Sequence, residues 1–196
     1  SDADGSYRGL NQEIYSHRET KRYSAYSLWD VFRSWVPLMT LIEPELVRDW
    51  CYDLLNQSKE GGLLPKWPLN GNYTGTMVGY PAVAVFYDAL QKGIIDSIPE
   101  EFLAAAVRSS KWQPEFAHRH QGTRAARVMP QHIYYKENQA YIPYNRIPES
   151  VSYGLELAFY DWCIAGMAQN LNQKDIEVAY KEKSNTYKAY FDSSVG

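Results

Sequence analysis

The sequence predicts an all-α domain, because apolar residues recur at helical spacing along much of the chain while strand-like alternation is absent. No stretch alternates apolar and polar residues convincingly for more than four positions. We expect about seven helices, joined by long loops and stacked as pairs in a barrel or a solenoid. No repeat at a fixed period is visible, which argues against a regular solenoid.

Composition sets the broad class of the protein. The 196 residues are 45% hydrophobic and 22% charged, which indicates a globular domain with a real core. No apolar run approaches the roughly 20 residues of a membrane-spanning helix, so no membrane partner is expected. The formal net charge is −3 without a basic stripe, which makes nucleic acid an unexpected partner. The first residues show no signal peptide.

The first helix is predicted to begin at Ser27. Residues 1–26 are polar and irregular, and we expect an extended loop or a short strand pair there. The run from Ser27 to Asp30 has the Ser-x-x-acid form of a capping box. The helix should continue to about Val36, where Pro37 interrupts or ends it.

The remaining helices have clearer boundaries. Glu43-Pro44 opens a helix that Gly61-Gly62 ends, and a long loop follows as far as Gly79. Within residues 112–147 we predict only that a short helix is present. Four further helices are expected, over residues 81–92, 99–111, 149–170 and 174–190. The helix over residues 149–170 has one apolar stripe, made by Val151, Leu155, Ala158, Phe159, Trp162, Ala165 and Ala168.

Two residue types leave their roles open. Cys51 and Cys163 both lie in apolar helical patterns, so they are either buried free thiols or a disulfide. The chain has 17 Tyr and six Trp residues. Such rings either present a flat apolar face to a sugar or fill a helical core.

Four segments carry a family resemblance, in the order that the family has them. They are DADGSYRG at residues 2–9, YSLWDVFRS at 26–34, GGLLPKWPL at 61–69 with MVGY at 77–80, and the run from ESVS at 149–152 to DWCIA at 161–165. Together they resemble glycoside hydrolase family 92. The residue patterns alone would not identify this family.

The resemblance implies a fold and an activity. Members are calcium-dependent, exo-acting α-mannosidases that invert the anomeric centre, and their substrate is a mannose-containing glycan. Their catalytic domain is an (α/α)6 toroid that follows a β-sandwich, and the sugar lies where the two meet. Residues 1–196 would form the first half of the toroid, a partial toroid without the sandwich or the C-terminal catalytic segment. Such relatives are periplasmic, cell-surface or secreted proteins.

The same resemblance places the catalytic groups outside this chain. In the family, the general acid, the aspartates near the general base and the calcium-binding segment lie further along. We therefore expect no catalytic or metal-binding residue here, no bound calcium, and no activity of this chain by itself. An incomplete toroid should also expose apolar helix faces, which is a hazard for self-association. The alternative is a non-catalytic helical module that binds glycans or another protein.

Four residues are the candidate substrate-binding site. An ionised Asp30 could accept hydrogen bonds from two sugar hydroxyls, and the neighbouring Trp29 offers apolar surface and one N–H. The family has a matching Trp-Asp pair at the terminal mannose. The alternative is that Asp30 only caps its own helix and that the Trp29 ring is part of the hydrophobic core. Lys66 and Trp67 lie in the long loop, where they either reach a cleft or are an exposed lysine and a ring that pins the loop.

Other polar residues have simpler interpretations. Arg33 follows Asp30 by three residues, so the two could form an intrahelical pair. Glu149 and Asp161 lie roughly 18 Å apart on one helix, too far for the about 6.5–9.5 Å separation of an inverting carboxyl pair. Glu149 suits the first turn of its helix, and Asp161 suits a contact with a neighbouring loop.

The four histidines are not expected to bind a metal, and two positions differ from the family pattern. His17, His118, His120 and His132 show no recognisable metal-ligand spacing, and we expect surface or packing roles for them. Pro81 stands where relatives usually have His, and Tyr160 stands where they often have Asp. The chain therefore resembles a divergent member of the family. The sequence does not define which mannose linkage such a member would cleave.

Overall fold

The computed structural model describes residues 2–16, 21–117 and 128–195, and it confirms the all-α class. Its helices are α1 (Leu28–Val31), α2 (Trp35–Ile42), α3 (Pro44–Gly61), α4 (Ala82–Gln91), α5 (Pro99–Ser109), α6 (Pro114–Ala117), α8 (Gln131–Asn138), α9 (Ser150–Asn170) and α10 (Lys174–Ser184), and α10 continues into the 3-10 helix η1 (Asn185–Tyr190). None of the described helices is both long and apolar enough to cross a membrane.

The described residues also form two small antiparallel sheets. Strand β1 (Tyr7–Arg8) pairs with β2 (Ile14–Tyr15), and β3 (Pro68–Leu69) pairs with β4 (Asn72–Tyr73). The first confirms the short strand pair expected before residue 26. The second lies inside the segment predicted as a long loop.

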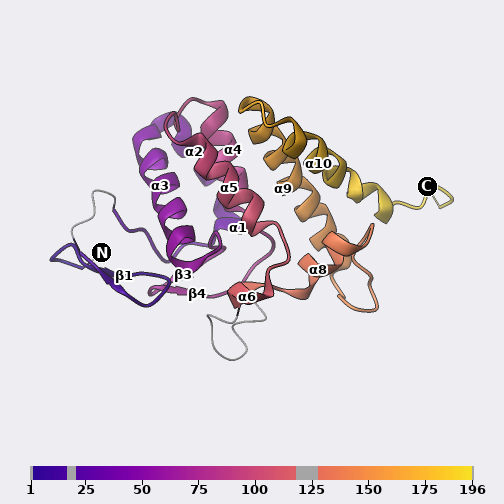
Figure 1. Ribbon diagram of the computed structural model, residues 1–196, viewed down its shortest axis with the longest axis horizontal. Helices are drawn as coiled ribbons and strands as arrows, with labels where there is room; N and C mark the ends of the chain where they lie inside the picture. The colour runs from indigo at the N-terminus through magenta and orange to yellow at the C-terminus, as the bar shows by residue number, and fades with distance from the viewer. Residues whose placement is uncertain (1, 17–20, 118–127, 196) are drawn as a thin grey trace.

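The long helices stand side by side above a layer of loops and short strands (Figure 1). Helices α2, α3, α4 and α5 form one group, and the antiparallel hairpin of α9 and α10 lies beside it. Helix α9 packs against both α4 and α5, so it joins the two groups. The strands, α6 and α8 belong to this layer, which runs along one edge of the long helices.

The prediction for the first helix is wrong in its details. Helix α1 ends at Val31 after a single turn, and α2 starts afresh at Trp35. Pro37 neither interrupts nor ends a helix, because it lies in the first turn of α2, where its missing N–H costs nothing. The Ser27 side chain makes no capping bond, since the Asp30 N–H donates instead to the Ser27 carbonyl at 3.2 Å.

The other predicted helices are confirmed within one or two residues. Helix α3 begins with Pro44 and ends before Gly62, whose φ of 91° is the left-handed conformation that glycine tolerates. Gly93, with φ 67°, follows α4 in the same way. The region predicted to hold a short helix contains both α6 and α8 in its described part. The end of the last predicted helix is the 3-10 turn η1.

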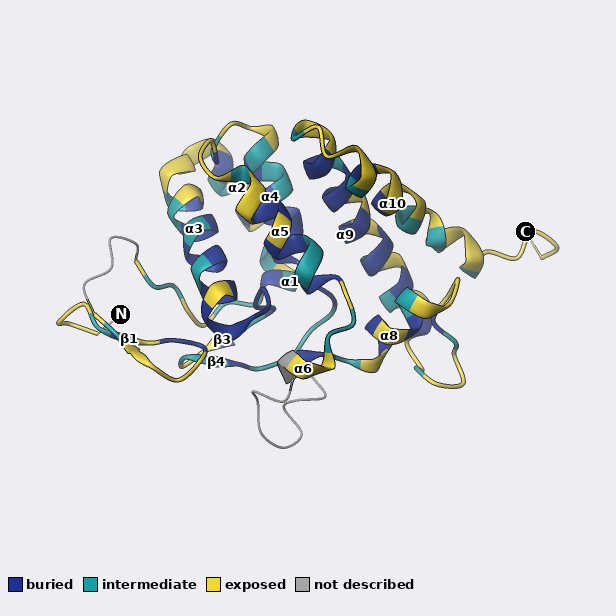
Figure 2. Ribbon diagram, viewed as in Figure 1, coloured by how far each residue is buried: buried dark blue, intermediate teal, exposed yellow. Residues whose placement is uncertain are grey.

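The apolar stripe predicted for α9 does not face the core as a whole. Ala158, Ala165 and Ala168 are buried, but Phe159 and Trp162 are 41% and 51% exposed. The residues of α9 that fill the core lie on another face, where Leu157, Tyr160, Ile164 and Met167 are almost fully buried. Figure 2 shows the buried residues of α9 along the sides that meet α4, α5 and α10. The sequence pattern cannot separate two apolar faces of one helix.

The two cysteines are buried, unbonded thiols, which confirms one of the two sequence interpretations. Cys51 is on α3 and Cys163 on α9. Burial raises the pKa of both thiols well above the ordinary value.

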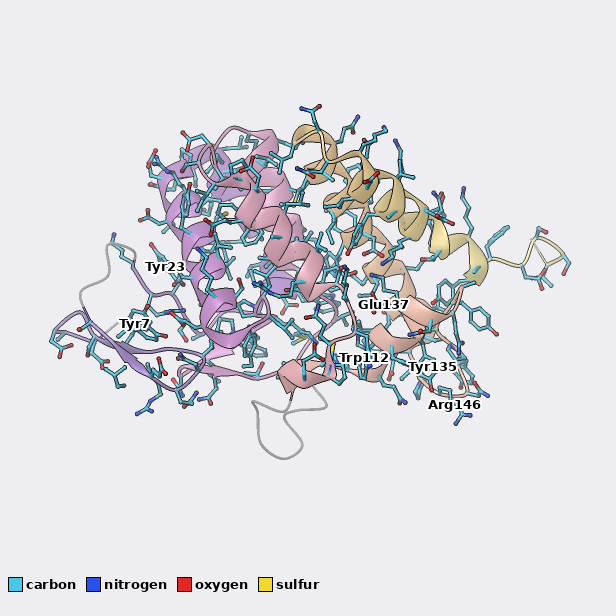
Figure 3. The ribbon with its side chains drawn as sticks, in the orientation of Figure 1. Tyr7, Tyr23, Trp112, Tyr135, Glu137 and Arg146 are labelled. Atoms are coloured by element: carbon cyan, nitrogen blue, oxygen red, sulfur yellow. The ribbon has the colours of Figure 1, made fainter. Side chains whose placement is uncertain are left out.

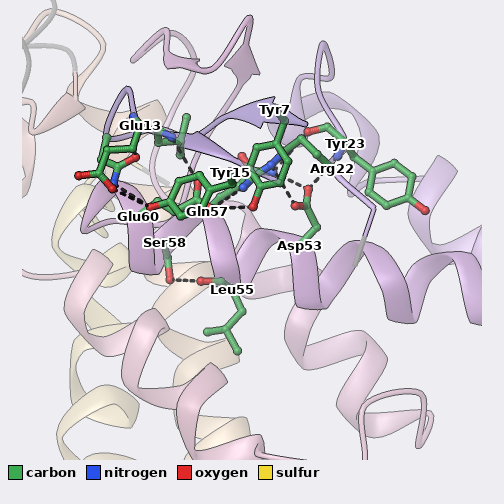
Figure 4. A network of polar contacts seen from close by, with 12 residues as sticks. Tyr7, Glu13, Tyr15, Arg22, Tyr23, Asp53, Leu55, Gln57, Ser58 and Glu60 are labelled. Carbon is green, nitrogen blue, oxygen red and sulfur yellow. Dashed lines mark hydrogen bonds and ion pairs between the residues drawn. The ribbon is translucent and has the colours of Figure 1, made fainter. Parts of the chain in front are cut away.

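A network of buried charges ties the N-terminal segment to α3 (Figure 4). The Arg22 guanidinium contacts Asp53 at 3.4 Å and Glu60 at 2.5 Å. Tyr7 donates to Glu60 at 3.2 Å, and Gln57 donates to Asp53 at 2.7 Å. Burial raises the pKa of Asp53 from 3.8 to about 6, although Arg22 opposes the shift.

This pKa predicts a pH dependence of stability. A raised pKa means that folding favours the protonated carboxyl, so the contribution of Asp53 is complete below about pH 4 and is lost as the pH rises through about 6. An Asp53→Asn substitution removes the titration. We expect the variant to gain stability relative to the parent between pH 4 and 7, by up to about 3 kcal/mol in urea unfolding.

The exposed Glu45→Gln substitution on the same helix is the matched control and should leave the pH profile unchanged. The expectation fails if the difference between Asp53→Asn and the parent shrinks as the pH rises. That result would mean that the ionised carboxylate is net stabilising beside Arg22.

Candidate functional site

Backbone hydrogen bonds bring the two halves of the predicted site together. The Leu28 N–H, at the start of α1, donates to the Lys66 carbonyl at 3.0 Å. Three residues earlier, the Ala25 N–H donates to the Pro68 carbonyl at 2.9 Å. The segment before α1 therefore runs alongside the loop after α3. As a result the pair Trp29–Asp30 and the pair Lys66–Trp67 lie on neighbouring stretches of backbone.

Asp30, two residues after Leu28, is exposed to solvent. Because the predicted capping box is absent, the Asp30 carboxylate is not used to cap α1. Trp29 is half-buried, so it is neither a fully buried core residue nor a surface one. The interpretation of Asp30 as a helix cap is thus wrong, and its carboxylate faces solvent.

The two tryptophans share an unusual feature. The indole N–H groups of Trp29 and Trp67 are both shielded from solvent, and neither has a hydrogen-bond acceptor among the residues that the structure describes. A buried donor without an acceptor costs roughly 1–3 kcal/mol, so each group would gain from an acceptor supplied by another molecule or segment.

Lys66 is buried, with 8% of its surface exposed, so the interpretation as an exposed lysine is wrong. Burial lowers the pKa of its ammonium from 10.5 to about 8. The side chain lines a small cavity together with Tyr80 and Ser109. Its main chain, through the carbonyl that accepts from Leu28, holds α1 in place.

Arg33 does not form the intrahelical pair with Asp30. Its guanidinium contacts the Glu156 carboxylate of α9 at 2.5 Å, and its Nε donates to the Trp29 carbonyl at 3.0 Å. Sequence reasoning missed Glu156 as a neighbour of the site. Its place in the run from ESVS to DWCIA is the signal that could have drawn attention to it.

Asp161 is a structural residue. It is fully buried and accepts from the Tyr80 hydroxyl at 2.7 Å and the Lys136 ammonium at 2.8 Å. Burial raises the pKa of Asp161 and lowers that of Lys136, and their ion pair opposes both shifts. The predicted contact with a neighbouring loop is confirmed, because Tyr80 lies in the segment before α4, two residues from its start.

The partner lysine comes from α8, which a second contact holds in position. The backbone N–H of Trp112 donates at 2.6 Å to the carboxylate of Glu137, which is itself a residue of α8; Figure 3 labels both residues. Glu149 lies one residue before α9 and is exposed, without a capping bond. Glu149 and Asp161 thus have separate surroundings, as their distance along the helix predicted.

His132 has the packing role expected for it. Its ring stacks on Tyr153 with centroids 4.3 Å apart, and burial lowers its pKa from 6.5 to about 3. His17, His118 and His120 lie outside the described residues. No three His, Cys, Asp or Glu side chains converge within the described part of the chain.

The aromatic residues differ in where they lie. Several rings fill the core, among them Tyr80, Phe86, Phe102 and Tyr160. Others line a groove of about 300 Å³ beside α1, formed by Tyr23, Ser24, Tyr26, Val31, Trp35, Leu46 and Trp50. The edges of Tyr26 and Trp35 meet the Trp50 ring at centroid distances of 4.7 and 5.4 Å.

Comparison with known proteins identifies the family of this helical fold. The chain matches the glycosyl hydrolase family 92 catalytic domain over residues 1–196, and it therefore belongs to this family. A search of the curated proteins finds no match.

Solved structures of the family superpose closely on this chain. The family GH92 alpha-mannosidase BT3965 from Bacteroides thetaiotaomicron is 28% identical, with a TM-score of 0.81, and the match covers 97% of this chain and 24% of that one. A complex of the same protein with mannoimidazole matches equally well, with 23% of that chain covered. The family GH92 inverting mannosidase BT2199 from the same organism is 28% identical, with a TM-score of 0.82, and the match covers 100% of this chain and 25% of that one. The chain thus spans about a quarter of these relatives.

Proposed function

We propose that this chain forms part of the sugar-binding face of an exo-acting α-mannosidase that releases terminal α-linked mannose with inversion. Family membership and the likeness to two mannosidases support a glycosidase, and one of these relatives is an inverting enzyme. The observation that carries the proposal is the hydrogen bond from Leu28 to Lys66. It gathers Trp29, Asp30, Lys66 and Trp67 into one locality.

In this proposal Asp30 holds the sugar. Its exposed carboxylate accepts hydrogen bonds from two adjacent hydroxyl groups of a terminal mannose. The half-buried ring of Trp29 offers apolar surface to the C–H groups of the same sugar. Lys66 and Trp67 are proposed to contribute from the neighbouring loop, whose backbone is hydrogen-bonded to the start of α1. The complex of one relative with mannoimidazole supports a mannose-like ligand.

We further propose that the general acid and the general base come from the parts of the catalytic domain that this chain does not include. Residues 1–196 then form the first half of a ring of paired helices that works beside a β-sandwich. Two carboxylates of α9 are already engaged in other contacts, which supports this view: Asp161 is held in a buried ion pair and Glu156 in a contact with Arg33. The chain by itself would then be inactive.

Calcium is proposed to bind the intact protein through residues outside this chain. The described residues do not fit such a site, because they bring no three carboxylate, histidine or cysteine groups together, and calcium needs about 6–8 oxygen ligands. We propose a periplasmic, cell-surface or secreted location for the intact protein, on the resemblance to its relatives alone.

The carboxylate of Asp30 provides the direct test. In the full-length protein, Asp30→Asn keeps the shape and removes the charge. Because hydrogen bonds to a charged group contribute about 1.5–3 kcal/mol, we expect kcat/KM for an α-linked mannobiose to fall about a hundredfold. The exposed Asp96→Asn substitution is the control and should hydrolyse the disaccharide like the parent.

Three outcomes separate the candidate functions. Hydrolysis that Asp30→Asn reduces supports the mannosidase proposal. Mannose binding without hydrolysis by the full-length protein would favour a non-catalytic glycan-binding module. Unchanged hydrolysis in Asp30→Asn would show that this carboxylate does not hold the sugar.

Removal of calcium is a separate experiment. Treating the full-length protein with a chelator should abolish mannobiose hydrolysis, and added calcium should restore it. The 196-residue chain should bind no calcium in isothermal titration with calcium chloride. Hydrolysis that persists after exhaustive chelation would contradict the calcium proposal, and tight calcium binding by this chain would contradict the proposed location of the ligands.

We also propose that the isolated chain self-associates through exposed apolar residues. On α2 these are Trp35, Leu38, Leu41 and Ile42, and on α9 they are Val151, Leu155, Phe159 and Trp162. Contiguous faces of this kind rarely stay solvated. Sedimentation velocity should show concentration-dependent oligomers, and the double substitution Leu155→Lys with Phe159→Lys should reduce them. A chain that stays monomeric at high concentration would exclude this proposal.

A further inference from the structure

The Arg33 guanidinium is confined by four contacts at the candidate site. It lies 4.7 Å from the centre of the Trp29 ring and 4.8 Å from the centre of the Phe32 ring. Its Nε donates to the Trp29 carbonyl, and a terminal nitrogen donates to the Glu156 carboxylate. Since a planar guanidinium can stack and donate in its plane at the same time, all four contacts form together.

Glu156 is itself fixed from the core. One carboxylate oxygen accepts from Arg33 at 2.5 Å, and the other accepts from the Tyr160 hydroxyl at 2.9 Å. The Tyr160 ring is fully buried and meets Phe32 edge to face at 5.8 Å. Both oxygens of Glu156 therefore have defined partners. The path from the core of α9 to the Trp29 ring runs through Tyr160, Glu156 and Arg33.

This path acts on orientation more than on stability. The Arg33 side chain is 43% exposed, and ion pairs so open to solvent contribute only about 0–1 kcal/mol to folding. An unrestrained arginine side chain, however, carries about 2 kcal/mol of rotamer entropy. Fixing Arg33 over one face of Trp29 restricts the indole and leaves its remaining surface for a ligand.

We propose that Glu156 is a positioning residue for mannose binding, which acts through Arg33 to hold Trp29 beside Asp30. The inference rests on the proposed function, because it assumes that Trp29 and Asp30 contact the sugar. Tyr160 has a part in the same path, since its hydroxyl orients the Glu156 carboxylate. This gives the tyrosine at this position a role that an aspartate, with its shorter side chain and negative charge, would not supply beside Glu156.

The test uses steady-state hydrolysis of mannobiose by the full-length protein. Glu156→Gln keeps the size of the side chain but weakens its hold on Arg33. Arg33→Lys keeps the charge but lacks the planar fork. We expect each substitution to raise KM about tenfold and to change kcat less than about twofold, since a loss of uniform binding affects KM alone. The double variant Arg33→Lys with Glu156→Gln should be no worse than Arg33→Lys, because both act on one path.

A structural role would give another result. A variant that only lost folded protein would lower the apparent kcat in proportion and leave KM unchanged, and that outcome would overturn the proposal. Additive effects of the two substitutions on KM would also overturn it. Should Glu156→Gln fail to fold, Arg33→Lys decides the matter by the same KM criterion. Glu182→Gln, an exposed change on α10, should match the parent.

The two proposals can fail independently. If Asp30→Asn leaves hydrolysis intact, the proposed sugar site itself is wrong. If Asp30→Asn reduces kcat/KM while neither Glu156→Gln nor Arg33→Lys alters KM, the sugar site stands and the positioning role of Glu156 is wrong.

Discussion

The buried ion pair between Lys136 and Asp161 is the constraint that fixes α8 and the approach to α4 against α9. It joins α8 to α9, and the Tyr80 hydroxyl adds the segment that leads into α4. Removing one partner of such a pair typically costs about 3–5 kcal/mol, because the other charge is left uncompensated in the interior. One oxygen of Asp161 has no hydrogen-bond partner among the described residues, so the cost of burying this carboxylate is only partly offset.

Helix α9 connects this buried ion pair to a polar contact at the surface of the protein. Asp161 points into the core from one side of the helix, while Glu156, less than two turns earlier, holds Arg33 near α1. A helix that is fixed internally by a charge is a rigid base for a polar contact at its edge. The orientation of Trp29 is therefore linked to packing far from it in the chain, since Arg33 and Glu156 are separated by 123 positions.

The sequence predicted the long helices well because their signals are local. Pro44 and Gly62 mark the ends of α3 through backbone conformations that depend on few neighbours. The failures involve tertiary competition. At α1 the competition is local, since the Asp30 N–H donates to the Ser27 carbonyl and not to the Ser27 hydroxyl, and the helix ends at Val31. Lys66 is buried, although lysine is a residue type that is seldom buried. The contact of Arg33 with Glu156 could not be predicted, since sequence spacing favours partners on the same helix.

The two thiols have a consequence for the chemistry of the environment. Cys51 and Cys163 are each almost completely shielded from solvent, and their protons are held tightly, so neither offers the thiolate that oxidants and disulfide exchange require. An oxidising compartment would leave both sulfurs untouched as long as the helices stay packed. Oxidation of either cysteine would then record a past opening of the core, and a mispaired disulfide would be a product of unfolding rather than its cause.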